Sequence, residues 1–165
     1  MPTTDVHVVL RQLFSELADG AAEGGSAYIL NSGDAGLLHS LEKVPAAGAS
    51  LAVNGGATLA AHAQHLRFGL SLMNRWATDG GNPFADATWD EAWKVSDVSE
   101  PQWEEIRRGL QDESHRWLST LGSPRDVTVT ELMGMIASIA HVAYHLGAVR
   151  QIAQRARGPK EGTFA

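Results

Sequence analysis

Apolar residues recur at every third or fourth position in four long segments of the chain, which is the spacing of a helix with one buried face. The first segment shows this clearly, with an apolar stripe of Val6, Leu10, Leu13, Phe14 and Leu17. The four segments cover about residues 4–21, 57–77, 100–121 and 131–157. Because no segment alternates as strands do, the pattern predicts an all-α protein with four long helices.

Start and stop signals bound several of these segments. Ser99 followed by Pro101 predicts the start of the third helix, because serine caps helices and proline is tolerated in the first turn. We expect Thr130 to cap the last helix and Gly158-Pro159 to end it. We expect Gly20, Gly24 and Gly25 to end the first helix. The first, third and fourth helices therefore each have an end that the local sequence predicts.

The connections between the first three long helices are themselves long. One contains a short predicted helix over residues 36–44, which Asp34 caps. The other, residues 78–99, is loop-like and contains Trp89 and Trp93. Because antiparallel neighbours need only short loops, these connections predict a four-helix bundle with long crossovers and not a simple up-down-up-down bundle.

The composition is that of a soluble globular protein with a single domain over residues 1–165. Of the 165 residues, 44% are hydrophobic and 19% are charged. The formal charge of −6 and the scattered basic residues argue against nucleic acid as a partner. The chain has no cysteine, so any metal must be held by histidine or carboxylate. The first residues lack the pattern of a secretory signal, and we therefore expect a cytoplasmic protein.

One stretch of the last helix raises the question of a membrane span. Residues 132–149 contain no Asp, Glu, Lys or Arg over 18 positions. The same stretch contains two histidines, a tyrosine, a serine and two glycines, which favours a helix buried in a bundle over a helix in lipid. We therefore expect no membrane contact.

Two histidines, His141 and His145, lie one helical turn apart in this apolar stretch. Residues i and i+4 share a helix face, so both imidazoles can bind one metal ion or can be core histidines satisfied by hydrogen bonds. His62 and His65 of the second helix offer a third imidazole, which completes the minimum set for a metal site with an open position. The valine after His141 excludes the H-E-x-x-H motif of metalloproteases, and the chain has no E-x-x-H pair of the di-iron type.

The order of these histidines gives the chain a resemblance to a known family. One histidine in the second long helix, followed by H-x-x-x-H in the last, resembles the DinB-like/YfiT-like superfamily of metal-dependent enzymes. The stretches AYILNSGDAGLLHSLEKVPAAGAS and ATLAAHAQHLRF are similar to the family's segment between the first two bundle helices and to its second-helix entry. The resemblance covers nearly the whole chain. It departs after the second ligand, where His145-Leu146-Gly147-Ala148 stands in place of the family's common H-R-G-Q.

The resemblance implies a four-helix bundle that forms homodimers and holds zinc or nickel at a mononuclear site of three histidines. Carried over by position, the metal ligands are His65, His141 and His145. His62 is then either the competitor of His65 or a group behind the site. Relatives in the family include bacterial transferases of low-molecular-weight thiols and a mycothiol-dependent maleylpyruvate isomerase. The resemblance assigns no catalytic residue here.

We therefore expect a metal-dependent enzyme, a hydrolase or a low-molecular-weight-thiol S-transferase, acting on a small-molecule substrate. Its divalent ion would hold a water or a thiolate in the open position. The alternative is a non-catalytic dimeric protein, metal-binding or stress-related, in which any metal is structural. Trp89 and Trp93 would either pack between helices or, on a loop crossing the mouth of the bundle, cover the metal and exclude water.

Overall fold

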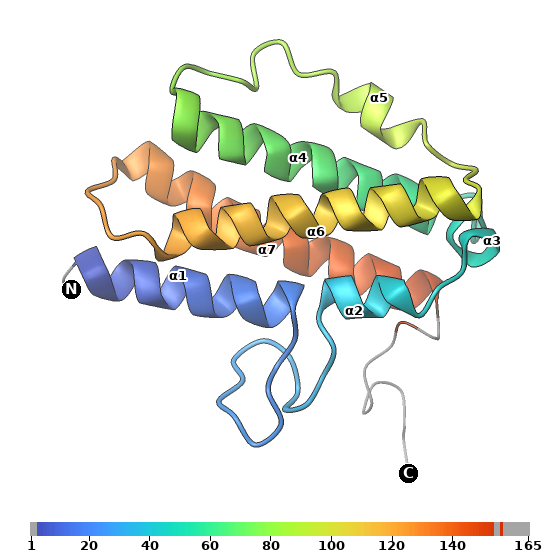
Figure 1. Cartoon of the computed structure of the whole chain (residues 1–165), viewed down its shortest axis with the longest axis horizontal. Helices are drawn as coiled ribbons and strands as arrows, with labels where there is room; N and C mark the ends of the chain where they lie inside the picture. The colour runs from blue at the N-terminus through green and yellow to red at the C-terminus, as the bar shows by residue number, and fades with distance from the viewer. Residues whose placement is uncertain (1–2, 154–155, 157–165) are drawn as a thin grey trace.

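The computed structural model describes residues 3–153 and residue 156, and within these residues the elements are all helices. The helices, labelled in Figure 1, are α1 (Thr3–Ala18), α2 (Leu37–Glu42), α3 (Ala46–Ala49), α4 (Leu59–Asp79), α5 (Trp89–Trp93), α6 (Glu100–Gly122) and α7 (Val129–Ile152). The prediction of an all-α protein is confirmed for this part of the chain. The four long helices are α1, α4, α6 and α7, and they correspond to the four amphipathic segments. The predicted stop at Gly158-Pro159 lies outside the described residues.

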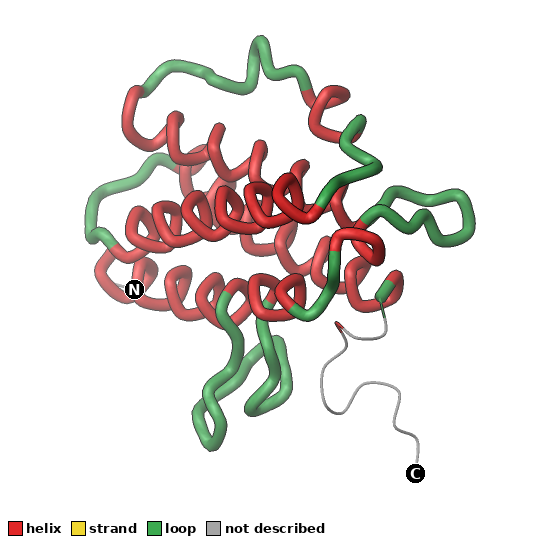
Figure 2. The backbone as a smooth tube through the Cα atoms, turned by 45° about the vertical axis from the view of Figure 1, so that its right-hand side comes forward, coloured by secondary structure: helices red, strands yellow, loops and turns green. Residues whose placement is uncertain are grey.

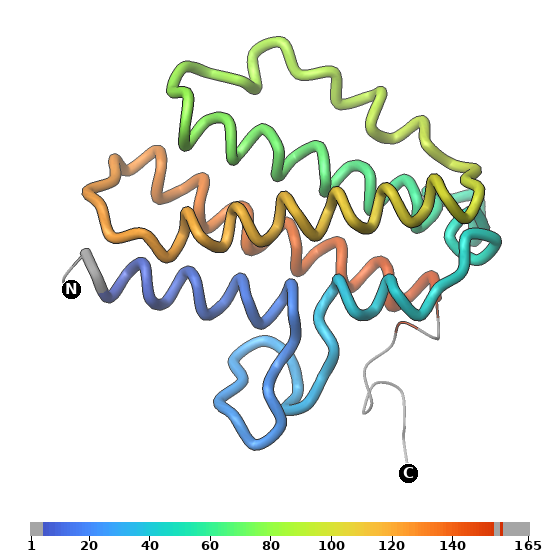
Figure 3. The backbone as a smooth tube through the Cα atoms, in the orientation of Figure 1, coloured from blue at the N-terminus to red at the C-terminus, as the bar shows by residue number. Residues whose placement is uncertain are grey.

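The four long helices lie side by side around a shared interior. α1 packs against α6 and α7, and α4 packs against the same two helices. The colours of Figure 3 show that α1 and α7 run in one direction whereas α4 and α6 run in the other. Consecutive helices α4 and α6 are therefore parallel neighbours, and the chain must return along the molecule between them. Figure 2 shows this return as a long loop that includes the short helix α5.

The interior is filled by the apolar stripes of the long helices. Phe14 and Leu17 of α1 are fully buried, as are Trp103 and Trp117 of α6. Each indole is also satisfied: Trp103 Nε1 donates to the carbonyl of Val44 at 2.7 Å, and Trp117 Nε1 donates to a serine hydroxyl of α7 at 2.8 Å. Full burial of a leucine or phenylalanine contributes roughly 1.5–3 kcal/mol. Packing of these stripes therefore holds α4 and α7 in fixed positions.

Two helix starts test the predicted caps. Ser99 is the N-cap of α6 with Pro101 in the first turn, as predicted. The expectation that Thr130 caps α7 is wrong, because the N-cap is Thr128. The Thr128 hydroxyl accepts from the backbone N–H of Glu131 at 3.2 Å, and Glu131 Oε2 accepts from the backbone N–H of Thr128 at 2.7 Å. This reciprocal pair needs a glutamate or glutamine three residues after the cap, and Glu131 takes that place for Thr128 and not for Thr130.

The expectation that Asp34 caps α2 is also wrong. The N-cap of α2 is Gly36, which has no side chain that could accept a hydrogen bond from the first turn. Asp34 is buried and forms a bidentate ion pair with Arg150 of α7, whose Nη1 and Nη2 donate to its two carboxylate oxygens at 3.0 and 3.1 Å. Arg150 Nη2 also donates to the carbonyl of Ala35 at 2.6 Å. The loop before α2 is therefore tied to the end of the helix that carries His141 and His145.

Two glycines allow this loop to approach the end of α1. Gly20 has a φ of +118°, and a Cβ there would lie 2.7 Å from the carbonyl oxygen of Asp34. A Cβ on Gly36 would lie 2.5 Å from the carbonyl oxygen of Ala18. Both positions therefore exclude any side chain. The close backbone contacts at Gly20 and Gly36 bring the two ends of the loop after α1 together and place Asp34 beside α7.

Helix α7 is the one described helix that is long and apolar enough to cross a membrane, as judged by length and composition. One such helix is a weak indication, because a core helix of a soluble protein meets the same criteria. The helix packs against α1 and α4, yet only 39% of its most apolar stretch is buried. Its other face exposes Val129, Met133, Ile136 and Tyr144. The prediction of a buried helix therefore holds for one face of α7.

Removal of the Asp34 carboxylate tests the buried ion pair. In Asp34→Ala the Arg150 charge stays buried without this carboxylate, so we expect the free energy of unfolding to fall by about 3–5 kcal/mol, measured by urea denaturation. The control is Glu105→Ala, which removes the 63% exposed partner of Arg67 and should cost no more than about 1 kcal/mol. Equal losses in the two variants would contradict the anchoring role of Asp34.

Candidate metal centre

Four histidines from two helices meet between α4 and α7. His62 and His65 come from α4, and His141 and His145 come from α7. His62, His65 and His145 are buried, and His141 is half-buried. The apolar faces of two neighbouring helices therefore enclose a set of polar rings.

The other three histidines lie outside this cluster. His7 Nδ1 is 2.7 Å from the carbonyl oxygen of Leu121. His39 Nδ1 contacts the carbonyl oxygen of Asp19 at 2.9 Å, and His115 Nε2 contacts the carboxylate of the same residue at 3.0 Å. None of these three histidines takes part in the site.

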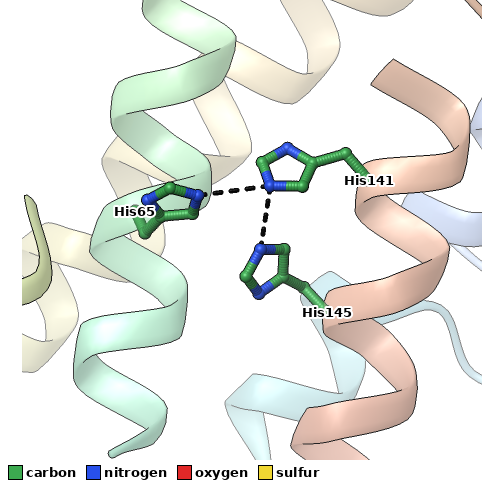
Figure 4. A group of neighbouring side chains, drawn as sticks. All are labelled: His65, His141 and His145. Atoms are coloured by element: carbon green, nitrogen blue, oxygen red, sulfur yellow. Dashed lines mark hydrogen bonds between the residues drawn. The ribbon is translucent and has the colours of Figure 1, made fainter. Parts of the chain in front are cut away.

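Three of the four central histidines direct ring nitrogens at one another, as Figure 4 shows. His141 Nε2 lies 3.2 Å from His65 Nε2 and 2.9 Å from His145 Nε2. In a tetrahedral site with metal–nitrogen bonds of about 2.0–2.1 Å, the ligand nitrogens stand about 3.3 Å apart. The structure thus brings together the three histidines named from the sequence, at a spacing from which they could hold one metal ion.

Hydrogen bonding alone does not satisfy this arrangement. Each ring nitrogen of a neutral imidazole has one in-plane direction, which serves either one proton or one lone pair. His141 Nε2 faces two other nitrogens at once, and it can donate to or accept from only one of them. A metal ion accepts a lone pair from all three nitrogens. The geometry therefore fits a bound cation better than a core cluster of hydrogen-bonded histidines.

His62 lies behind His145. The Nδ1 atoms of the two rings are 2.8 Å apart, so His62 contacts the nitrogen of His145 that does not face the cluster. With the lone pair of His145 Nε2 directed at the cluster, the Nδ1–H group donates to His62 and fixes both tautomer and ring orientation. Of the two candidates on α4, the geometry favours His65 as the ligand and His62 as the group that orients His145.

The group of converging ligands has three members. Among the described residues it includes no fourth histidine, aspartate or glutamate. Structural zinc sites are normally closed by four protein ligands, whereas three protein ligands leave a position for water or substrate. The cluster therefore has the ligand count of an open site.

Burial keeps these imidazoles neutral. Burial, with smaller contributions from the neighbouring His141 and His62, lowers the pKa of His65 to about 4. Burial also lowers the pKa of His145 to about 3, with smaller contributions from the other three rings. The pKa values of His62 and His141 are lowered by burial as well. Since neutral imidazole is the form that binds metal, protons do not compete for these nitrogens near pH 7.

Two tryptophans of the connection between α4 and α6 cover the cluster. The Trp93 ring stacks on His65, with ring centroids 4.2 Å apart and 25° between the planes, and it meets His62 edge-on at 5.3 Å. Trp89 lies 5.5 Å from His65. Of the two roles considered for these tryptophans, the structure confirms that they cover the histidines. They close one side of the cluster to water.

The sequence-based reasoning missed two residues that support this cover. A Cβ on Gly69 would lie 3.6 Å from Trp89 Cζ3 and 3.8 Å from His141 Cε1, so the glycine lets these rings approach the helix. Phe84 stacks on Trp89, with centroids 6.5 Å apart and 7° between the planes. Glycine inside a helix costs about 1 kcal/mol relative to alanine. A glycine one helical turn after His65 is therefore the signal from which a close contact at Gly69 could have been predicted.

The lowered pKa values predict how pH affects the metal-free protein. An unfolded chain protonates histidine below pH 6.5, whereas folded His65 and His145 stay neutral down to about pH 4 and 3. The unfolded state therefore binds more protons in this window, and the free energy of unfolding falls as the pH drops below 6.5. Above pH 7 these groups contribute no pH dependence. Urea unfolding in the presence of a chelator measures the effect.

A double variant isolates the histidines from other titrating groups. In His65→Gln/His145→Gln the carboxylates titrate as in the parent protein, but two of the depressed imidazoles are gone. We expect its free energy of unfolding to fall less than that of the parent protein between pH 6.5 and pH 4. If the free energies of unfolding of the two proteins fall equally between pH 6.5 and pH 4, the lowered histidine pKa values do not govern this pH dependence.

Comparison with known proteins assigns this chain to no family. No protein-family description matches it, and no curated protein or solved structure matches it. The resemblance to the DinB-like superfamily therefore stays an expectation from the sequence.

Proposed function

We propose that this chain is a metal-dependent enzyme in which His65, His141 and His145 hold one divalent ion with an open coordination position. The observation that carries the proposal is the approach of their Nε2 atoms to 2.9 and 3.2 Å around His141. Imidazole ligands suit zinc and nickel, the two ions that the family resemblance implies. On the same resemblance we assign the four long helices to a four-helix bundle with long crossovers of the DinB-like type.

The ligand set favours a negatively charged fourth ligand. Three neutral imidazoles leave the full charge of a divalent ion uncompensated, and the three-residue group contains no carboxylate. Partial burial strengthens the attraction between this charge and an anion. When bound, the ion lowers the pKa of a coordinated water or thiol and so supplies a nucleophile near neutral pH. This chemistry supports hydrolysis of a small molecule or transfer of a low-molecular-weight thiol.

Residues around the ligands have supporting roles. His62 accepts from Nδ1–H of His145 and so holds the opposite nitrogen toward the metal position. Trp93 and Trp89 exclude water from the side of His65, which strengthens electrostatic interactions within the site. His62 is therefore a positioning residue, and the two tryptophans form a wall.

The alternative function, a non-catalytic protein with a structural metal, has less support. Such a site needs a fourth protein ligand. His62 is the nearest candidate, but its Nδ1 is engaged with the far nitrogen of His145. The ring of His62 would have to leave this hydrogen bond to reach the metal position.

Metal titration of single variants tests the assignment. His145→Ala should abolish binding of Zn²⁺ or Ni²⁺ in titration calorimetry of protein without a histidine tag, because two ligands remain. Circular dichroism should show the helices retained, since packing of apolar stripes holds them. His62→Ala should weaken metal binding by about 10–100-fold, the usual effect of losing a residue that orients a ligand.

The exposed His39 provides the control, and His39→Ala should bind metal as the parent protein does. If His62→Ala loses the metal while His65→Ala keeps it, the ligand assignment on α4 is wrong. If His145→Ala binds metal normally, the proposed function fails.

We further propose a homodimer that forms through the exposed face of α7. Val129, Met133, Ile136 and Tyr144 are 53–76% exposed and lie on one side of the helix. A two-fold axis would pair this face with itself, and an uncharged face can do so without like-charge repulsion. Contiguous exposed apolar surface is typical of such interfaces.

Light scattering tests the dimer. Met133→Glu/Ile136→Glu should halve the measured mass, because four carboxylates would meet across the two-fold axis. Gln111→Glu, an exposed change on α6, should leave the mass unchanged. A parent protein that is monomeric at high concentration would refute the proposal.

A further inference from the structure

A pocket of about 210 Å³ lies between α4 and α7 and has His141 in its wall. The side chains of Leu70, Met73 and Val142 form its apolar part. His141 belongs both to this pocket and to the histidine cluster, so the pocket shares one side chain with the proposed metal site. A larger cavity of about 830 Å³ lies between α1 and the loop that follows it, and none of the four histidines lines that cavity.

The pocket offers its occupant no charge. Among the described residues that line it, none is Asp, Glu, Lys or Arg. Its one hydroxyl, on Ser138, already accepts from Trp117 Nε1 at 2.8 Å and donates to the carbonyl of Met135 at 2.7 Å. A charged group placed in the pocket would lose hydration without gaining an oppositely charged side chain as a partner. An apolar group would gain free energy from leaving water.

Small residues on both helices create the space. Gly69 of α4 and Gly134 of α7 line the pocket with Ala137. A Cβ on Gly134 would lie 2.6 Å from Trp76 Cζ3, so the backbone of α7 can lie against this indole only at a glycine. The pocket is therefore set by the packing of the two helices that also position the histidines.

We propose that this pocket binds the uncharged, apolar substituent of the substrate whose reacting group occupies the open metal position. The inference rests on the proposed function and adds a substrate class to it. An apolar cavity of about 150 Å³ is large enough for benzene. The favoured substrates are therefore small molecules with an alkyl or aryl group of roughly that size beside the metal-binding atom, and those with a charge at that place are disfavoured.

Binding of alkanethiols to the Co²⁺-loaded protein tests the pocket. Co²⁺ replaces the native ion as a coloured probe, and the thiolate-to-cobalt absorption band reports binding at the metal. Ethanethiol and butanethiol differ by two methylenes, and each methylene that leaves water should tighten binding about fourfold. We expect butanethiol to bind about 15-fold more tightly than ethanethiol.

A matched pair of variants distinguishes binding in the pocket from a general preference for the more hydrophobic thiol. Ala137→Leu fills the rim of the pocket from an exposed position of α7, where a larger side chain disturbs no core packing. It should reduce the 15-fold preference to less than about threefold. Ala52→Leu adds the same side chain at an exposed position that is neither in the pocket lining nor on α7, and it should keep the full preference.

The outcomes distinguish this inference from the proposed function. The proposed role of the pocket is wrong if the parent protein binds both thiols equally, or if both variants lose the preference to the same extent. Neither result would contradict the metal site. A protein that binds no Co²⁺, or that gives no thiolate band with either thiol, would overturn the proposed function and the pocket with it.

Discussion

The contacts among four neutral imidazoles between α4 and α7 are the interaction on which the rest of the site depends. Burying polar rings is costly unless their nitrogens are satisfied. The contacts run from His62 through His145 and His141 to His65, and every step is 2.8–3.2 Å long. One nitrogen of His141 nevertheless faces two neighbours, which a hydrogen-bonded set cannot satisfy. A cation at that point would convert three competing lone pairs into three bonds.

Contacts at the end of α7 and beside the site help to keep the two histidine-bearing helices in place. The Asp34–Arg150 ion pair ties the end of α7 to the loop before α2. The return connection between the parallel helices α4 and α6 is required by their direction, and it also delivers Trp93 onto His65. Helix α7 is apolar both on the face that packs against α1 and α4 and on the opposite, exposed face. This explains why its composition approaches that of a membrane helix although one face packs within the fold.

Much of the architecture follows from local sequence. The 3.6-residue periodicity predicts the four long helices, because burial of one helix face is a local pattern in the chain. Ser99 with Pro101 predicts the start of α6 for the same reason. The i, i+4 spacing of His141 and His145 places both rings on the same face of α7. The start of α7 could also be predicted locally, since Thr128 has a glutamate three residues later whereas Thr130 has a methionine there.

The rest depended on contacts between residues far apart in the chain, which no local pattern encodes. Asp34 suits a helix cap by its type, but the guanidinium of Arg150 reaches it across 116 positions and satisfies both its oxygens. Helical spacing alone leaves both His62 and His65 as candidates, although the family resemblance points to His65. The rotation of α4 against α7 turns His65 toward His141 and His62 toward the far nitrogen of His145. Sequence by itself determined which helices form and which faces carry imidazoles. Tertiary structure decided which nitrogens meet and what covers them, because those relations arise only when the helices pack.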